Sequence, residues 1–513
     1  MKTSLFHSFD GNRILGRVIL ATVLLFLFFT QQTKAFSLLG PFENWMTVTN
    51  GFMVSPSDLG GPMDITQGYR WNVPVITYAF DQSFIDCFGT NGVAAVEGAI
   101  QILNDLPPAS QIDLNSYPPN TTANNLAAAS ASLVDLKSAA LFLVLQQLGL
   151  AQPTRYAFCL HDFDYSATSN IVTAATILDR NFDPVSFLPT NFVNRFEYTN
   201  FTVGDYFEGQ FFAMEDVFAL DPLTPIYTAV ADSGGYFNDG LLPGTFYTRL
   251  TFDDVGGLHF LLRTNNFQFE PLLSDVHGTG TNAGSYVNVA LRAGIDKITF
   301  IRQDYDPLLE RAYVPVTNQF ADTYLTNNTI MHQQLERIVS TPDIIFTVSN
   351  VWNNWGYQST CTSNWLNNAN LAGNPGAPGP GIIRPPINIA FEPNVAATIF
   401  TGDFQPENTS SISQVRWGSF DNSTNSPVVY PVEKFQQSVS SAEIDLQING
   451  NDSILAFFSW DSPMLFGKAM AFQTSTNLLD WTTAGIVTNW GLPITWAHNS
   501  ILPQRFFRVV PSN

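Results

Sequence analysis

The chain has 513 residues, 43 of them Phe, and a formal net charge of −21. Its 45% of hydrophobic residues can fill a large core and more than one domain. The acidity argues against a nucleic-acid partner, whose phosphates need Lys and Arg, and against anionic membrane surfaces.

The first 35 residues have the pattern of a secretory signal peptide. Lys2, Arg13 and Arg17 precede an apolar run at 18–29, and the small residue Ala35 follows it. As a helix this run spans about 18 Å, which is shorter than the roughly 30 Å hydrocarbon core of a bilayer. We therefore expect cleavage near Ala35, a secreted or extracellular protein, and no membrane contact after cleavage. The alternative is an uncleaved membrane anchor.

Residues 36–165 are expected to form an α+β domain. The segment 69–81 is rich in aromatic and β-branched residues, which favours a strand. Apolar residues at helical spacing predict a helix over 93–106, and the apolar segment 134–148 predicts a buried helix. Gly149 follows that helix at the position where glycine commonly ends one.

Residues 166–340 show mostly short strand and turn signals. Within this region we expect two short helices, at 257–263 and at 320–338. The second rests on three apolar residues in helical phase, namely Met331, Leu335 and Ile338.

Residues 341–435 are expected to be rich in β-strands and to contain a long Pro- and Gly-rich loop at 373–386. Residues 436–513 contain successive short strand signals at the spacing of a β-sandwich. The fold class predicted from the whole chain is α+β, with an N-terminal α+β region and a β-rich C-terminal region that ends in a sandwich-like module.

The C-terminal segment resembles a known accessory module. Residues 472–481 read FQTSTNLLDW, and residues 505–510 read RFFRVV. This pattern resembles the small β module that ends many secreted bacterial proteins, with an STNL…W turn and a closing FYRV strand. The chain as a whole is also similar to a group of uncharacterised secreted bacterial proteins. The resemblance implies export and a surface setting, without any established chemistry.

The N-terminal domain resembles the opening of a matrixin-type metzincin metalloprotease. Arg70-Trp71 and the ITYAFD segment at 76–81 precede a helix, and a later helix ends before Gly149. In that family the second helix carries the zinc motif H-E-x-x-H-x-x-G-x-x-H, whose histidines bind zinc and whose Glu activates water.

The zinc motif itself is missing from this chain. Aligning the family pattern on Gly149 places Phe142 and Gln146 at the helix histidines, Leu143 at the Glu, and Gln152 at the third histidine. Phe and Leu have no donor atom, and Gln is a poor zinc ligand. The resemblance therefore implies a pseudo-enzyme on a metalloprotease fold, and we expect no metal and no cofactor.

Two Asp/His pairs are the candidate catalytic residues. Asp253 and His259 lie around Gly256-Gly257, and Asp275 and His277 precede a Gly-rich turn. If they converged, they could orient a general base. The competing interpretation is that the carboxylates bond local backbone N–H groups in turns.

An aromatic stretch is the candidate binding site. Trp352, Trp355, Tyr357 and Trp365 lie among several Asn residues, beside the Pro- and Gly-rich loop. Aromatic faces stack on sugar rings and amides bond hydroxyl groups, so the expected partners are carbohydrate or other cell-surface components. The competing interpretation is that these Trp residues are core residues.

The cysteine count is odd, so at least one thiol of the three is unpaired in a monomer. A disulfide between Cys87 and Cys159 is possible, because both lie in the first domain. We find no H-E-x-x-H, G-x-S-x-G, P-loop or C-x-x-C motif. The leading hypothesis is therefore a secreted or cell-surface, non-enzymatic binding or surface-structural protein. The alternatives are a secreted hydrolase with an unrecognised Asp/His site and a pseudo-enzyme with a zinc metalloprotease fold.

Overall fold

The structure is a computed structural model of the whole chain. It describes residues 35–50, 52, 58–153, 155–166, 171–193, 196–200, 215–219, 229–232, 241–280, 283–305, 313–349, 359–361, 364–367, 381–393, 395–398, 412–431, 443–449, 453–459, 469–475, 482–488, 494–499 and 506–511. The expected signal peptide and most of the loop at 373–386 lie outside these residues.

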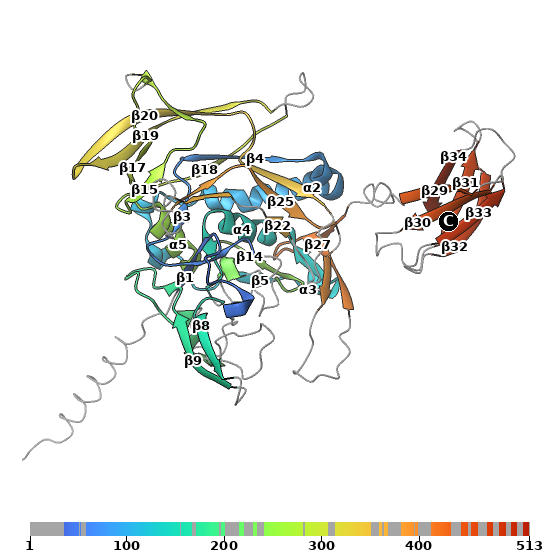
Figure 1. Ribbon diagram of the computed structural model, residues 1–513, viewed down its shortest axis with the longest axis horizontal. Helices are drawn as coiled ribbons and strands as arrows, with labels where there is room; N and C mark the ends of the chain where they lie inside the picture. Colours follow the sequence, from blue (N-terminus) through green and yellow to red (C-terminus); the bar gives the residue numbers. More distant parts are fainter. Residues whose placement is uncertain are drawn as a thin grey trace, which may run out of the picture. The chain divides into compact units, whose positions relative to one another are not determined.

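The chain divides into two compact units, Met1–Tyr430 and Pro431–Asn513. The first combines helices with several sheets, and the strands of the second form two small sheets (Figure 1). This confirms the α+β class with a β-rich C-terminal end. In the part of the chain that the structure describes, every helix is too short or too polar to cross a bilayer.

A mixed sheet forms the centre of the first unit. Its strand order is β18 (Thr299–Arg302), β4 (Val75–Phe80), β21 (Ile344–Val348), β25 (Ile387–Phe391) and β22 (Ser359–Cys361). The first four strands run parallel, and β22 is antiparallel to β25. Strands from the segments that we expected to be separate, 36–165, 166–340 and 341–435, thus pair within one sheet.

Helix α2 (Gln82–Asn104) follows β4 directly and packs on this sheet and on α4 (Leu136–Gln147). Asp81 begins α2 by accepting a hydrogen bond from the Ser83 N–H. Gly89 breaks the helical geometry with a φ of 60°. The many Phe residues meet in the core between α2 and the sheet, where ring contacts join Phe80, Phe84, Phe88, Phe346, Phe391, Trp417 and Tyr430.

The buried helix expected over 134–148 is α4, and nearly all of its side chains are buried. Asp135 begins it by accepting hydrogen bonds from the N–H and hydroxyl of Ser138. Gly149 follows with a φ of +99°, and a Cβ there would lie 2.4 Å from the carbonyl oxygen of Tyr69. Glycine is therefore required both by the backbone conformation and by this close approach.

The helix expected over 320–338 is wrong. This segment forms the hairpin of β19 (Val316–Thr326) and β20 (Thr329–Val339), whose turn places Asn327 and Asn328 at φ values of 49° and 57°. Asn is among the residues that tolerate this left-handed conformation in two-residue hairpin turns. The helical spacing of Met331, Leu335 and Ile338 was coincidental, because Met331 and Leu335 lie on one face of the strand and Ile338 on the other.

The hairpin belongs to a five-stranded antiparallel sheet (Figure 1, yellow and green). Its order is β15 (Gln268–Pro271), β17 (Val289–Arg292), β19, β20 and β16 (Val276–Gly278). Helix α5 (Phe252–Leu262) precedes it in the chain and overlaps the helix expected at 257–263.

The remaining elements of the first unit are short. They are β1 (Phe36–Gly40), β2 (Gly61–Met63), β3 (Tyr69–Arg70), β5 (Thr122–Asn124), α3 (Leu126–Ser130), β6 (Leu133–Asp135), β7 (Leu150–Ala151), β8 (Cys159–Ser166), β9 (Ile171–Leu178), β10 (Asn181–Phe182), β11 (Phe192–Val193), β12 (Phe196–Asn200), β13 (Glu215–Ala219), β14 (Thr245–Tyr247), β23 (Asn364–Asn367), β24 (Gly381–Arg384), β26 (Val395–Thr398), β27 (Ile412–Ser419) and β28 (Val428–Val429), with 3-10 turns at Val48–Asn50, Ala109–Gln111, Leu114–Ser116 and Val230–Asp232.

The second unit consists of two three-stranded antiparallel sheets. One has the order β29 (Glu443–Asn449), β30 (Ser453–Ser459) and β33 (Ile494–Asn499), and the other β32 (Thr482–Thr488), β31 (Ala469–Ser475) and β34 (Phe506–Pro511). The structure thus confirms that the C-terminal end of the chain is rich in β-strands.

The possible disulfide does not form, because Cys87 and Cys159 are both buried and unpaired. Cys87 lies on α2 among Phe side chains, whereas Cys159 begins β8. Burial raises the pKa of both thiols, that of Cys159 to about 12, so neither is a thiolate at neutral pH.

Candidate functional site: an inverted five-stranded sheet

Asp253 and His259 both lie on α5, where the neighbouring carboxylate has a structural role. Asp254 forms a capping box with Thr251 and also accepts hydrogen bonds from the N–H groups of Val230 and Ala231. Asp253 is buried one residue earlier in the same turn. His259 is half-buried one turn before the helix ends, and its ring lies 6.5 Å from that of Phe187.

Asp275 and His277 have different neighbours. Asp275 forms an ion pair with Arg337 at 2.8 Å, and His277 is exposed on β16 opposite Glu336 of β20. The four predicted residues thus belong to two pairs with separate surroundings, one on α5 and one beside β20. No group of three His, Cys, Asp or Glu side chains in the described ranges could hold a metal ion.

Of the predicted aromatic set, only Trp365 lies within the described residues; Trp352, Trp355 and Tyr357 lie outside them. Trp365 is half-buried on β23, with its ring 6.3 Å from that of the buried Tyr69. It therefore packs partly against the core.

The five-stranded sheet buries several charged side chains, together with apolar ones such as Phe320, Leu335 and Val339. Arg70 of β3, which is 1% exposed, donates from Nε to Glu270 of β15 at 2.7 Å. Its terminal nitrogens donate to three backbone carbonyls, those of Leu261, Asn266 and Arg292. Burial raises the pKa of Glu270, although the charge of Arg70 opposes the shift.

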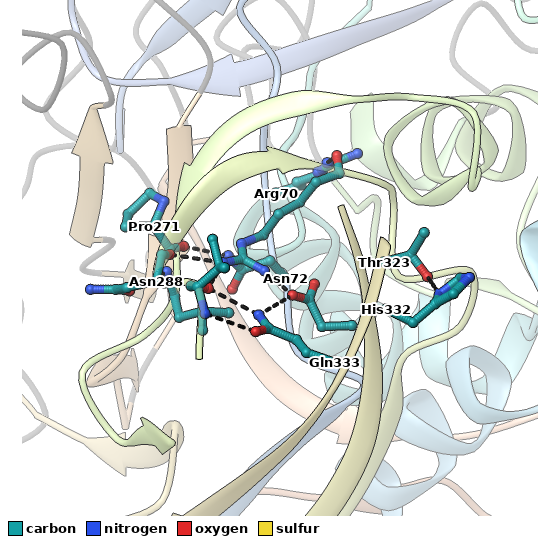
Figure 2. A network of polar contacts seen from close by, with 11 residues as sticks. Arg70, Asn72, Pro271, Asn288, Thr323, His332 and Gln333 are labelled. Carbon is teal, nitrogen blue, oxygen red and sulfur yellow. Dashed lines mark hydrogen bonds and ion pairs between the residues drawn. The ribbon is translucent and has the colours of Figure 1, made fainter. Parts of the chain in front are cut away.

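The buried charges continue from β15 across β17 and β19 (Figure 2). Arg292 forms an ion pair with Asp322 and donates to the carbonyls of Val287 and Asn288. Gln333 of β20 donates to Asp322 at 2.7 Å and to the Val287 carbonyl, and accepts from the Val287 N–H. Positive and negative groups therefore alternate along the inner face.

A third buried arginine attaches the far side of this sheet to the central sheet. Arg337 of β20 donates to both carboxylate oxygens of Asp343, at 2.9 and 2.5 Å. Asp343 in turn accepts from the Thr77 N–H on β4 at 2.8 Å. The hydrogen bonds fix the register of the two sheets, because each guanidinium has one matching set of acceptors.

The outer face of the same sheet carries a row of large apolar side chains. Phe269 pairs with Leu291, Leu291 with Leu325, and Leu325 with Ile330, so these side chains form one straight row across four strands. Ile330 is 57% exposed, Leu291 40% and Phe269 36%. We call these four residues the apolar row.

Charges are scarce around the apolar row. The other outward-facing residues of the five strands are Val289, Thr317, Gln319, Ala321, Thr323, His332, Gln334, Glu336, Ile338 and His277. Among these described residues, only Glu336 carries a formal charge at pH 7. Thr323 and His332 join by a hydrogen bond of 3.0 Å (Figure 2). The sheet thus buries several charged side chains beside apolar ones and exposes the apolar row, whereas ordinary antiparallel sheets keep charges on the solvent face. We call it the inverted sheet.

The outer face of the inverted sheet is a surface that can bind an apolar, uncharged partner. Sequence reasoning missed it because Met331, Leu335 and Ile338 fall at helical spacing, which predicted a helix over this segment. The Asn327-Asn328 pair between two alternating segments was the signal that could have revealed the hairpin.

The candidate zinc positions also lie in the core. Phe142 and Leu143 are buried on α4, and Gln152 is buried just after β7. A cavity of about 20 Å³ lies near α5, between Leu103, Leu258 and Phe300. It has room for about one water molecule, so it is not a substrate pocket.

Comparison of the chain with protein-family models, with curated proteins and with solved structures finds no match.

Proposed function

We propose that this chain is an exported, non-enzymatic surface protein whose copies associate through the outer face of the inverted sheet. The observation that carries the proposal is the exposed apolar row on the outer face of a sheet that turns four charged side chains inward, namely Glu270, Arg292, Asp322 and Arg337. The signal-peptide pattern at the N-terminus supports export.

The distribution of charge favours a second copy as the partner. Two chains with a net charge of −21 repel each other over most of their surfaces. The outer face carries only Glu336 as a formal charge among the residues described, so two copies can meet there with the least repulsion. Charge depletion is also typical of the centre of protein–protein interfaces.

The geometry of the apolar row is compatible with self-association. Neighbouring strands lie about 4.8 Å apart, so the row is about 15 Å long. A twofold axis parallel to the sheet would bring the row against the same row of the second copy, with the two sheets about 10 Å apart. Full burial of a large apolar side chain contributes about 1.5–3 kcal/mol. Because the side chains of the apolar row are about half exposed, about half of that free energy can still be gained on association.

Sedimentation equilibrium of the secreted chain tests the proposal. We expect a dimer at micromolar concentrations, and a monomer after Leu291→Glu or Ile330→Glu, because each substitution places two like charges in the interface. Leu126→Glu is the matched control, since Leu126 is 84% exposed on α3, outside the sheet. A wild-type chain that stays monomeric at about 100 μM, or glutamate variants that dimerise as well as the control, would refute the proposal.

A further inference from the structure

The end of α5 carries a cation with an unusual environment. Arg263 caps the helix, and its guanidinium carbon lies 4.1 Å from the ring centroid of Phe187 and 4.6 Å from that of Phe260. The two ring centroids are 5.1 Å apart, so both rings approach the guanidinium from one side, an arrangement that is favourable for a cation.

Arg263 differs from the buried arginines in having no carboxylate partner. Each buried arginine forms an ion pair, namely Arg70 with Glu270, Arg155 with Asp58, Arg180 with Asp64, Arg292 with Asp322, and Arg337 with Asp275 and Asp343. Within the described ranges, no carboxylate lies at ion-pair distance from Arg263, and its buried Nε has no hydrogen-bond partner. Burial and the nearby charge of Arg70 lower the pKa of Arg263. In a chain with 43 acidic residues, this leaves a local excess of positive charge.

The loop that carries Phe187 holds the ring over Arg263 at a conformational cost. Phe187 has a φ of +59°, in the left-handed region that bulky residues rarely adopt. The carboxylate of Asp183 fixes the turn by accepting from the N–H groups of Val185 and Ser186. The Phe187 N–H donates to the Asp183 carbonyl at 2.8 Å. Residues held in such conformations often belong to ligand sites.

Glycine on α5 allows this loop to approach. A Cβ at Gly256 would lie 2.4 Å from the Cβ of Pro184, so only glycine permits the contact. Gly256 thus lets the loop that carries Phe187 lie close to the helix. Val185 and Leu188, on either side of Phe187, are 70% and 65% exposed and form an apolar rim.

His259 adds a neutral polar group one turn before Arg263. Burial and the charge of Arg263 lower the pKa of His259, so its imidazole is neutral at pH 7. Its buried Nδ1 has no hydrogen-bond partner among the described residues. A ligand hydroxyl or amide could supply one.

We propose that Arg263, with Phe187, Phe260 and His259, forms a binding site for an organic monocarboxylate that has an apolar body. The edge of a guanidinium matches a carboxylate with two parallel hydrogen bonds. Val185 and Leu188 offer an apolar surface to the rest of the ligand. A single negative charge fits better than a dianion, because the chain as a whole is strongly acidic. This site is independent of the proposed self-association, which uses another surface.

The test uses the secreted chain labelled with ¹⁵N-arginine and titrated with 3-phenylpropionate. We expect a saturable shift of the Arg263 Nε–H resonance. The neutral 3-phenylpropionamide should bind with an apparent affinity at least tenfold weaker than that of 3-phenylpropionate. Inorganic phosphate and sulfate form the third arm, and tighter binding of either would overturn the assignment to a monocarboxylate.

Substitutions distinguish binding at Arg263 from binding at other arginines of the chain. Calorimetric titration with 3-phenylpropionate should show at least a tenfold loss of affinity in Arg263→Gln, and none in Arg416→Gln, which changes an exposed arginine on β27. Phe187→Gly removes the ring and also the backbone strain, so it should lose binding while the chain stays folded. Unchanged affinity in either site variant, or no saturable shift in the wild-type chain, would overturn the proposal.

Discussion

The buried ion pair between Arg70 and Glu270 should affect stability strongly only when one of its two partners is removed. Replacing Arg70 with Met leaves the carboxylate of Glu270, which is 0% exposed, without its ion-pair partner. It also deprives three backbone carbonyls of their donor. Breaking a buried pair in this way costs about 3–5 kcal/mol. We therefore expect Arg70→Met to destabilise the sheet by about 4 kcal/mol or more.

Removing both charges should cost much less than removing one. In the Arg70→Met/Glu270→Met double variant no uncompensated charge remains, and such replacements are often close to neutral. The lost bonds to the carbonyls still cost about 1–2 kcal/mol, so we expect a coupling free energy of at least about 2 kcal/mol between the two positions. Arg302→Met is the matched control, because the Arg302–Glu97 pair is about 40% exposed and should contribute less than about 1 kcal/mol.

Hydrogen exchange measured on peptides from β19 and β20 gives the opening free energy of the sheet in each variant. If Arg70→Met costs no more than Arg302→Met, or if the two effects in the cycle simply add, the buried charges do not anchor the inverted sheet and the reasoning fails.

Two further substitutions test the packing and the electrostatics of the first unit. The pKa of Asp135 is raised to about 6 by complete burial. Since this folded-state pKa lies above the ordinary 3.8, stability is complete below about pH 4 and falls by about 3 kcal/mol as the pH rises through 6. Asp135→Asn should abolish this dependence in urea titrations between pH 4 and pH 8, and a variant with the wild-type slope would contradict the assignment. Gly256→Ala should clash with Pro184, which costs about 1–3 kcal/mol of stability and lowers the thermal unfolding temperature. Gly284→Ala is the control, because a Cβ there lies in open space and should not change the unfolding temperature. Equal unfolding temperatures would show that the loop at Pro184 yields without cost.

The parts of the fold that obey ordinary patterning could be predicted from the sequence. Helix α4 is apolar on all sides and ends at a left-handed glycine, and both features follow from residues 134–149. Strand β21 lies in the segment 341–435, which was expected to be rich in β-strands, and consists of β-branched and aromatic residues. The series of short strands in the second unit was also expected from the strand signals in residues 436–513.

The hairpin was mispredicted for a physical reason. Asp322, Gln333 and Arg337 face inward, where apolar residues are normally found, and their cost is offset by partners from distant segments of the chain. Arg70 and Glu270 are 200 positions apart, so no local pattern reveals that they pair. The same holds for Arg263, whose importance depends on the absence of a carboxylate that only the structure can show.

Hydroxyl-radical footprinting of the purified chain, read by mass spectrometry at low and high protein concentration, tests the central claim most directly. Radicals oxidise exposed apolar side chains, so a covered surface loses reactivity. We expect Phe269, Leu291 and Ile330 to become protected as the concentration rises, while Leu126 and Leu188 stay equally reactive. If the apolar row stays fully reactive in samples that sedimentation shows to be dimeric, the copies associate through another surface and the account is contradicted.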